Sequence, residues 1–286
     1  MTTPSRALIT HISEQLGSPL TGWERMTGGQ TNISWKAQSQ SRTLVIKLFE
    51  PTAESPLFPN SARDEARMLR QLGPIGLSPV LRAVSVFENQ DVLIYDHLDG
   101  SPWHERPQDA ARALAVLHTQ TPPPDLRQVP GGSAWIERQT AKLLALLPEH
   151  DQTKLAALKP HTYVPESDRA VLLHGDPVPG NLIVGPVQTA FIDWQCPAIG
   201  DACEDLALFL SPSMQYVYRG CPLRAEDHQE VLTAYGDKAL TKRLLLLAPW
   251  HHWRMAAYCA WKVARGHDIY RDGMALELAA LRRTLA

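Results

Sequence analysis

Apolar residues recur at strand spacing in the first third of the chain and mainly at helical spacing beyond it. The pattern predicts strands at 43–49, 80–86 and 92–95, and two strands joined through Gly28 and Gly29 around the stretch 26–37. It predicts helices at 5–17, 61–72, 107–118 and 134–147, a hairpin between Asn181 and Asp193, and mainly helical structure over 222–286. The predicted fold class is therefore α+β. It has a small N-terminal lobe (1–98) with an antiparallel β-sheet and a helix, and a larger, mainly helical C-terminal lobe (99–286).

Length and composition narrow the class of protein. A chain of 286 residues is long enough for two lobes. A formal net charge of −2 without a basic run argues against a nucleic-acid partner. The four cysteines form no CxxC pair, so we expect them to be reduced. No apolar stretch of about 18 residues and no signal-peptide pattern occurs, so we expect a cytoplasmic protein without a membrane partner.

The densest set of candidate functional residues lies between 172 and 205. His174, Gly175 and Asp176 follow a short apolar run, and Asn181 comes five residues after Asp176. The predicted hairpin brings the Asn181 amide beside the carboxylate of Asp193, and oxygen ligands of this kind suit Mg²⁺. Asp176 then faces the same space without binding the ion, as in phosphoryl transfer, where one carboxylate orients the attacking hydroxyl. The alternative is a set of turn and cap residues.

A lysine interrupts the apolar strand at 43–49. A buried Lys47 ammonium is costly unless a partner or an anion meets it. On the helix at 61–72, Glu65 borders the apolar face and can point toward Lys47, an ion pair that holds the lysine on nucleotide phosphates in kinases. The alternatives are a lysine on the solvated side of an edge strand and a surface glutamate.

Three other positions are candidates for contacts with a nucleotide. Gly28 and Gly29 join two predicted strands and can present backbone N–H groups to phosphates, although as a pair they also fit an ordinary turn. Backbone groups around Tyr95 and His97, after the strand at 92–95, can meet adenine.

Candidate substrate residues lie farther along the chain. Asp201 precedes a predicted helix as either its cap or a substrate contact, and Asp205 lies in that helix's first turn with a mainly structural role. A helix predicted to begin at Pro249 and to end near Arg265 places three indoles, Trp250, Trp253 and Trp261, on one face. Such a stripe is either core or a site for a quaternary ammonium group, and Arg254 on the same side opposes the second use.

Taken together, the motifs HGDPVPGN, IDW and GDxxxDLA resemble those of the aminoglycoside phosphotransferase and choline kinase superfamily, over about residues 24–210. The resemblance implies a bilobal protein-kinase-like fold that uses ATP and Mg²⁺. It assigns Asp176 as the catalytic residue, Asn181 and Asp193 as metal ligands, Lys47 and Glu65 as the phosphate-binding pair, and Asp205 as the structural aspartate.

The resemblance also bears on the substrate. GGQTNISWKA is similar to the GG-x-TN loop of choline and ethanolamine kinases, whereas WQCPAIGD after the metal aspartate is closer to the broader phosphotransferase pattern. We therefore expect transfer of the γ-phosphate of ATP to a hydroxyl of a small molecule, such as choline, ethanolamine or a thiamine-like compound. The alternatives are an aminoglycoside-type phosphotransferase and a nucleotide-binding pseudokinase.

Overall fold

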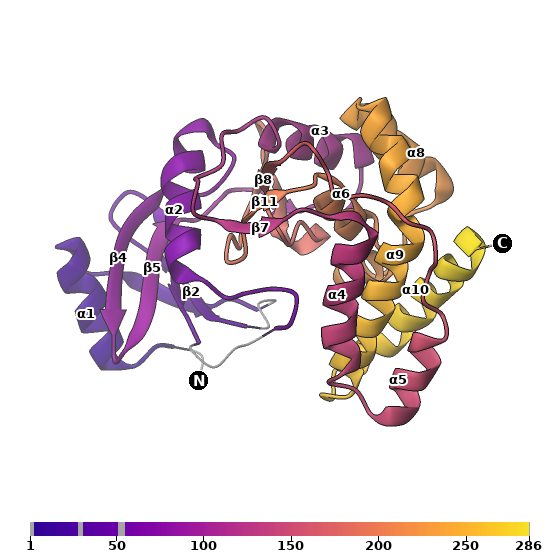
Figure 1. Cartoon of the computed structure of the whole chain (residues 1–286). Coiled ribbons are helices and arrows are strands. Elements are labelled where there is room, and N and C mark those ends of the chain that lie inside the picture. Colours follow the sequence, from indigo (N-terminus) through magenta and orange to yellow (C-terminus); the bar gives the residue numbers. More distant parts are fainter. Residues whose placement is uncertain (1–2, 28–30, 51–54, 286) are drawn as a thin grey trace. The chain divides into compact units, whose positions relative to one another are not determined.

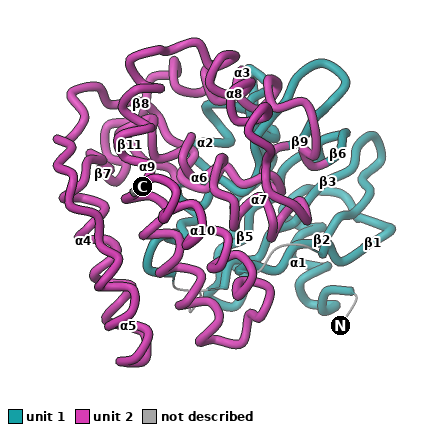
Figure 2. Tube along the Cα trace, turned by 90° about the vertical axis from the view of Figure 1, so that its right-hand side faces the viewer, with its two compact units in different colours: residues 1–101, 183–196 teal, residues 102–182, 197–286 magenta. Residues whose placement is uncertain are grey.

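The computed structural model describes residues 3–27, 31–50 and 55–285 and divides into two compact units (Figure 2). Unit 1 consists of residues 1–101 and 183–196, and unit 2 of residues 102–182 and 197–286. The chain thus leaves unit 1, builds part of unit 2, and returns to unit 1 for one hairpin. The lobe limits read from the sequence, 1–98 and 99–286, stay a prediction about domains.

Unit 1 is built on an antiparallel sheet (Figure 1). Its strands, in spatial order, are β1 (Thr21–Arg25), β2 (Ile33–Gln38), β3 (Thr43–Leu48), β5 (Gln90–Asp96) and β4 (Leu81–Phe87). A two-residue turn joins β4 to β5, with Glu88 and Asn89 both at positive φ (47° and 65°), as a type I′ hairpin requires. The predicted strands at 43–49, 80–86 and 92–95 are confirmed. Within the described part of the stretch 26–37 a strand forms only from Ile33 on, and the expected joint at Gly28 and Gly29 lies outside the described residues. The edge strand β1, for which the sequence predicted no bounds, is mostly exposed and lacks apolar alternation.

The helix α1 (Arg6–Leu16) begins after Ser5, whose hydroxyl accepts from the N–H of Leu8, and buries Leu8 and Ile12 in the sheet's core. The helix α2 (Ala62–Leu72) begins at a Ser61 cap. It follows β3 in the chain and presents a buried face that includes Glu65. A short 3₁₀ turn, η1 (Gly73–Ile75), follows it. Both helices lie where the sequence predicts them.

The return segment contributes the predicted hairpin, with strands β9 (Leu182–Val184) and β10 (Thr189–Phe191). The 3₁₀ turn η2 (Pro179–Asn181) precedes it, and the two-residue strand β6 (Ser101–Pro102) marks the first passage between the units.

Unit 2 is mainly helical, with a small sheet of β7 (Arg127–Val129), β11 (Ala198–Gly200) and β8 (Val171–Leu173). Its helices are α3 (Pro107–Leu117), α4 (Gly132–Leu144), α5 (Glu149–Ala156), α6 (Cys203–Leu210), α7 (Pro212–Arg219), α8 (Ala225–Tyr235), α9 (Lys238–Val263) and α10 (Ile269–Leu285). Helices α4 and α10 both pack against α9, and α3 packs against α8 (Figure 1). The predicted fold class is confirmed in both units, although α5 lies in a stretch for which the sequence predicted no element.

The start predicted for the tryptophan-rich helix is wrong. Pro249 lies inside α9, which begins eleven residues earlier at Lys238 after an Asp237 cap whose carboxylate accepts from the N–H of Leu240. A proline within a helix leaves the carbonyl four residues before it without an intrahelical donor. That carbonyl belongs to Leu245, which is 62% exposed, so water can serve it. Hence Pro249 is tolerated there and gives no start signal.

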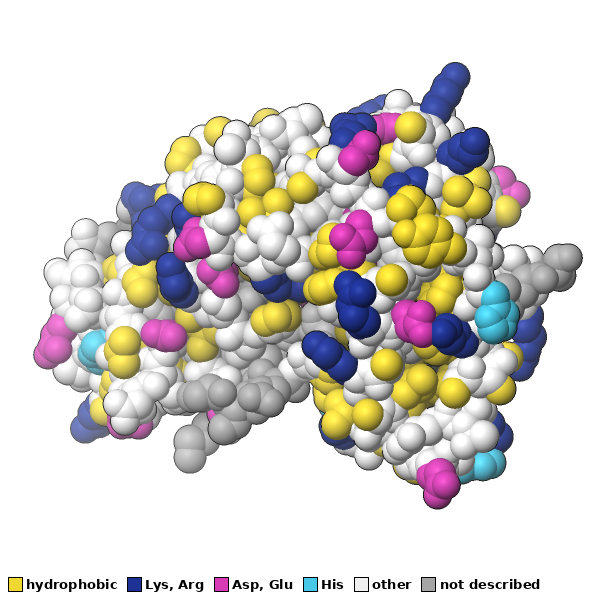
Figure 3. Space-filling view, in the orientation of Figure 1, with side chains coloured by type: hydrophobic (Ala, Val, Ile, Leu, Met, Phe, Trp, Pro, Cys, Tyr) yellow, Lys and Arg dark blue, Asp and Glu magenta, His cyan; other side chains and the backbone are white. Residues whose placement is uncertain are grey.

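Among the described residues, no helix combines the length and apolar character needed to cross a bilayer. On the face in Figure 3, basic side chains are interspersed with acidic ones. All four cysteines are free thiols, as expected.

Candidate active site

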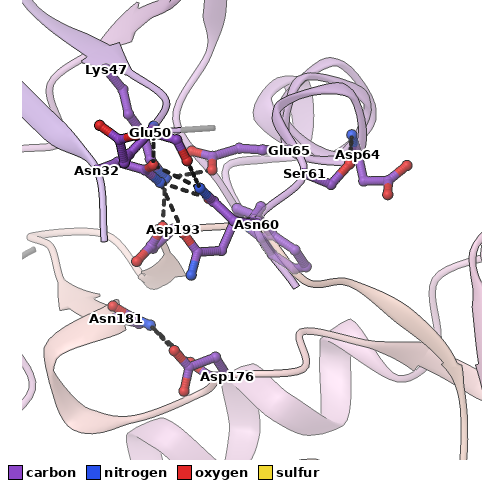
Figure 4. A network of polar contacts seen from close by, with 12 residues as sticks. Asn32, Lys47, Glu50, Asn60, Ser61, Asp64, Glu65, Asp176, Asn181 and Asp193 are labelled. Atoms are coloured by element: carbon purple, nitrogen blue, oxygen red, sulfur yellow. Dashed lines mark hydrogen bonds and ion pairs between the residues drawn. The ribbon is translucent and has the colours of Figure 1, made fainter. Parts of the chain in front are cut away.

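A buried lysine with two carboxylate partners forms the charged cluster of unit 1 (Figure 4). The Nζ of Lys47 lies 2.5 Å from Oε2 of Glu65 and 2.5 Å from Oδ1 of Asp193. Lys47 reaches them from β3, the buried strand between β2 and β5, and Glu65 from the inner face of α2. The expected contact between Lys47 and Glu65 is present, whereas the contact with Asp193 was not predicted.

Burial and charge act in opposite directions on this cluster. Burial lowers the pKa of Lys47, but the carboxylates of Asp193 and Glu65 raise it by more, so the ammonium stays charged. Burial also raises the pKa of Glu65, to about 7, because the charge and hydrogen bond of Lys47 offset the effect only in part and the charge of Asp193 adds to it. With one cation and two carboxylates, the cluster carries a formal charge of −1.

Asp193 adopts a backbone conformation that is uncommon outside glycine. It follows β10 at φ 62°, in the left-handed region, where aspartate and asparagine are more frequent than other non-glycine residues and surrounding contacts stabilise them. The contact with Lys47 is one such constraint. Its side chain is 31% exposed and its second carboxylate oxygen remains available to a ligand.

An asparagine that sequence reasoning left without a role connects three segments around this cluster. The Asn32 amide donates to Oδ1 of Asn60 (2.8 Å) and to Oε1 of Gln195 (3.0 Å), and its oxygen accepts from the N–H of Glu50 (3.0 Å). It therefore fixes the start of β2 to the approach of α2 and to the segment after Asp193. The TN pair in GGQTN was the available sequence signal. Gly28 and Gly29 of the same motif lie outside the described residues.

The two candidate adenine contacts lie at the end of β5 and just beyond it. Tyr95 is 8% exposed and pairs with Val45 across the sheet. The backbone N–H of His97 donates to the carbonyl of Thr43 at 3.0 Å. A nucleotide contact at His97 would therefore use groups other than this N–H, and the assignment of both residues stays a prediction.

In unit 2, a buried carboxylate holds the loop that carries Asp176. Asp205, which is 1% exposed, accepts from the backbone N–H of His174 (2.8 Å) and of Gly175 (2.9 Å). Gly175 has φ 84°, a conformation that favours glycine. His118 approaches the same carboxylate at 3.2 Å and bonds Tyr235 through its other ring nitrogen.

The environment of Asp205 keeps it ionised. Burial raises its pKa, but the hydrogen bond and charge of His118, the charge of His174 and the N–H of Gly175 together hold it below its ordinary value. Asp205 therefore has the geometry of a brace for the 174–176 loop. His118, at the end of the helix predicted at 107–118, contributes to that brace.

Asp176 and Asn181 lie together within unit 2 (Figure 4). The amide nitrogen of Asn181 donates to the backbone carbonyl of Asp176 at 2.9 Å and to its carboxylate at 3.3 Å. The amide oxygen consequently faces away from Asp176 and is available as a ligand. Asp193 lies in the other unit, so its predicted approach to Asn181 stays a prediction.

The candidate substrate residues are buried within unit 2. Asp201 is 1% exposed, precedes the N-cap residue of α6, accepts from the N–H of Cys203 at the start of that helix (3.0 Å) and pairs with Arg243 (2.8 Å). These contacts favour the cap over the substrate role for Asp201.

Of the three tryptophans, two are tied to neighbouring backbone. The indole N–H of Trp250 donates to the carbonyl of Thr162 (2.8 Å) and that of Trp253 to Leu155 (2.7 Å). Burial and these bonds favour the core reading for Trp250 and Trp253. Arg254, expected to oppose a cation site, is instead a buried partner of Glu204 at 2.7 Å.

Comparison with known proteins identifies the family to which this chain belongs. The sequence profile of the phosphotransferase enzyme family matches residues 22–246, well over half of the chain. The chain belongs to this family. No curated protein matches the chain.

Solved structures with a similar fold include kinases of different small molecules. A choline/ethanolamine kinase family protein from Mesorhizobium loti aligns with a TM-score of 0.64 at 18% identity, over 92% of this chain and 88% of its own. A spectinomycin phosphotransferase, solved with ADP and spectinomycin, aligns with a TM-score of 0.65 at 14% identity, over 98% of this chain and 99% of its own. An amicoumacin kinase, solved with AMP-PNP and Ca²⁺, aligns with a TM-score of 0.64 at 14% identity, over 96% of this chain and 93% of its own.

Proposed function

We propose that this protein transfers the γ-phosphate of ATP to a hydroxyl group of a small molecule, with Mg²⁺ as the metal ion. The observation that carries the proposal is the buried Lys47 ammonium, 2.5 Å from both Glu65 and Asp193. A buried cation with this partner set is costly as a structural device alone, since replacing a buried ion pair by apolar residues is often neutral or stabilising. Family membership and the nucleotide complexes of similar folds support the same conclusion.

The residues present fit a magnesium ion. Mg²⁺ binds a small number of protein oxygens and keeps water and substrate phosphate as its other ligands. The carboxylate of Asp193 has one oxygen beyond the one that meets Lys47, and the amide oxygen of Asn181 is turned away from Asp176. The formal charge of −1 on the lysine cluster favours a cation beside Asp193. When bound, the metal neutralises charge on the transferring phosphoryl group.

Each proposed catalytic residue has a separate task. Lys47, fixed by Glu65, orients the nucleotide phosphates, and Asp193 and Asn181 hold the metal. Asp176 accepts a hydrogen bond from the substrate hydroxyl and orients it for attack, while Asp205 keeps the loop of Asp176 in place. Positioning and charge neutralisation then supply most of the rate enhancement, as is general for phosphoryl transfer.

A coupled ADP-release assay tests the proposal. The acceptors are choline, ethanolamine, thiamine, homoserine, methylthioribose, aminoglycosides and anionic alcohols, with mass spectrometry to identify a phosphorylated product. We expect one class to stimulate ADP release, and Asp193→Ala to abolish it. Asp176→Asn should depress the rate far more than it weakens ATP binding. ATP binding without transfer to any acceptor would indicate a pseudokinase and contradict the proposal.

A further inference from the structure

A group of aromatic side chains in unit 2 lies beside the loop that carries Asp176. We call it the aromatic cluster, and its members are Tyr218 on α7, Tyr258 and Trp261 on α9, and Tyr270 on α10. The rings of Tyr258 and Trp261 are stacked at 5.7 Å and 24°, and Tyr258 meets Tyr270 edge-on at 6.0 Å and 82°. The cluster therefore forms where three helices converge.

Two observations place the cluster next to the candidate catalytic residue. Gly180, in the turn between Asp176 and Asn181, lies so close to Tyr218 that an added Cβ would meet its ring at 3.1 Å. Burial raises the pKa of Tyr218 and lowers that of Lys262, and the charge of Asp176 acts upward on both, so its carboxylate lies near each of them. A molecule presenting its hydroxyl to Asp176 would thus have the cluster as a neighbour.

The protein's own cations already cover these rings. The ammonium of Lys262 lies 5.9 Å from the ring centroid of Tyr258, 5.8 Å from that of Trp261 and 5.4 Å from that of Tyr270. The guanidinium of Arg265 lies 4.3 Å from the Trp261 ring. Distances within about 6 Å are those of attractive cation–π contacts. The aromatic faces that suit a quaternary ammonium ligand are therefore occupied from within.

The same cations set the charge that a ligand would meet. Lys262 and Arg265 carry two positive charges, and the carboxylate of Asp176, which acts on Lys262, offsets one of them. With the remaining positive charge, a cationic substrate group near the cluster would be repelled and an anionic group attracted. In addition, the indole N–H of Trp261 is buried and has no acceptor among the described residues. An anionic oxygen is the kind of group that suits both an ammonium and an N–H donor.

We propose that the phosphate acceptor is a small alcohol bearing an anionic oxygen group, a carboxylate or a phosphate, which lies beside Lys262. Cationic amino alcohols and aminoglycosides are then disfavoured. The inference rests on the proposed function, because it takes Asp176 as the group that meets the hydroxyl. The enzyme would accordingly prefer anionic acceptors over cationic ones.

Titration calorimetry tests the inference without requiring turnover. The probes are glycerate, glycerol 3-phosphate, glycerol and choline, so that carboxylate, phosphate, neutral and cationic alcohols are compared. Lys262→Met keeps the length of the side chain but removes its charge, and Lys262→Ala also uncovers the rings. Lys242→Met, an exposed position on the same helix, is the matched control.

For the unmodified protein we expect a Kd for one anionic probe at least tenfold below that for choline. Lys262→Met should reduce this preference at least tenfold, Lys262→Ala should bind choline more tightly than the unmodified protein, and Lys242→Met should leave all values unchanged. Thermal melts of each variant verify folding. Equal or undetectable binding of all probes, or an anion preference that survives Lys262→Met, overturns the inference. Anion binding without ADP release from any acceptor would contradict the proposed function instead.

Discussion

The ammonium of Lys47 lies 2.5 Å from a carboxylate oxygen of Asp193, a residue 146 positions farther along the chain. The contact is possible because the hairpin of β9 and β10 belongs to unit 1, although most of the chain around it belongs to unit 2. Lys47 thereby connects Glu65 on α2 to the residue proposed to hold the metal. Its loss should affect both the fold of unit 1 and the chemistry.

Lys47→Met should lower kcat/KM about 10²- to 10³-fold, the usual effect of removing one donor that stabilises developing charge. It should also destabilise the protein by about 3–5 kcal/mol, because Glu65 is left as a buried carboxylate without its cation. Urea unfolding and steady-state kinetics measure the two effects.

The double variant Lys47→Met/Glu65→Gln separates these effects. Removing the uncompensated charge should recover much of the lost stability but none of the activity. Lys36→Met, on the neighbouring strand and paired with a largely exposed Glu24, serves as the control and should change neither quantity appreciably. Recovery of activity in the double variant would contradict the role assigned to Lys47.

The sequence predicted the pair of Lys47 and Glu65 because both signals are local: a charge inside an apolar strand, and an acid on the border of a helix's apolar face. The contact of Lys47 with Asp193 could not be predicted in this way. It depends on which unit the hairpin joins, and hydrophobic periodicity carries no information about that choice.

The aromatic cluster illustrates the same limit. Helical spacing placed Trp250, Trp253 and Trp261 on one face of α9. In the structure, the indoles of the first two donate to backbone carbonyls in α5 and in the segment after it, and the third packs with Tyr258. The sequence singled out Arg254 as the cation beside the indoles, whereas the structure places the Lys262 ammonium 5.8 Å from the ring centroid of Trp261. The third ring around that ammonium belongs to Tyr270 on another helix, so no pattern along α9 alone could identify the group.

Asp205→Asn should weaken the brace on the Asp176 loop. Both carboxylate oxygens of Asp205 accept backbone N–H groups, and the asparagine NH₂ would face one of these donors and leave it unsatisfied. We expect a loss of about 1–3 kcal/mol in unfolding free energy. The kcat should fall while the KM for ATP changes little, as measured by steady-state kinetics. Glu230→Gln, a substitution of an exposed acid on α8, is the control.

His251 should make stability depend on pH. The side chain is 3% exposed, and burial, followed by the charge of Arg254, holds its pKa well below the ordinary value of 6.5. Asp201 raises this pKa, while His252 and Arg243 lower it further. Because the folded pKa is depressed, the unfolded chain binds a proton first as pH falls.

The contribution of His251 to the free energy of unfolding is therefore fully present above about pH 6.5. It is lost as pH falls toward the folded pKa, by up to about 1.4 kcal/mol per pH unit. Urea unfolding between pH 5 and 8 measures it. His251→Gln should flatten the curve below pH 6.5, whereas the exposed His161→Gln should not. Parallel curves for all three proteins would show that His251 is not the group responsible.

Trp253→Phe distinguishes a core residue from a substrate contact. The indole is 2% exposed and its N–H donates to the carbonyl of Leu155 at 2.7 Å, so phenylalanine keeps most of the apolar contact but leaves that buried carbonyl without its donor. We expect the unfolding free energy to fall by about 1–3 kcal/mol, while KM for the acceptor stays within about twofold of that of the unmodified protein.

Trp261→Phe is the matched comparison, because its N–H has no acceptor among the described residues and its ring contacts Lys262 and Arg265. That substitution should cost less stability and change the acceptor KM more. If Trp253→Phe instead raised KM severalfold with an unchanged melting temperature, the indole would belong to the substrate site and not to the core.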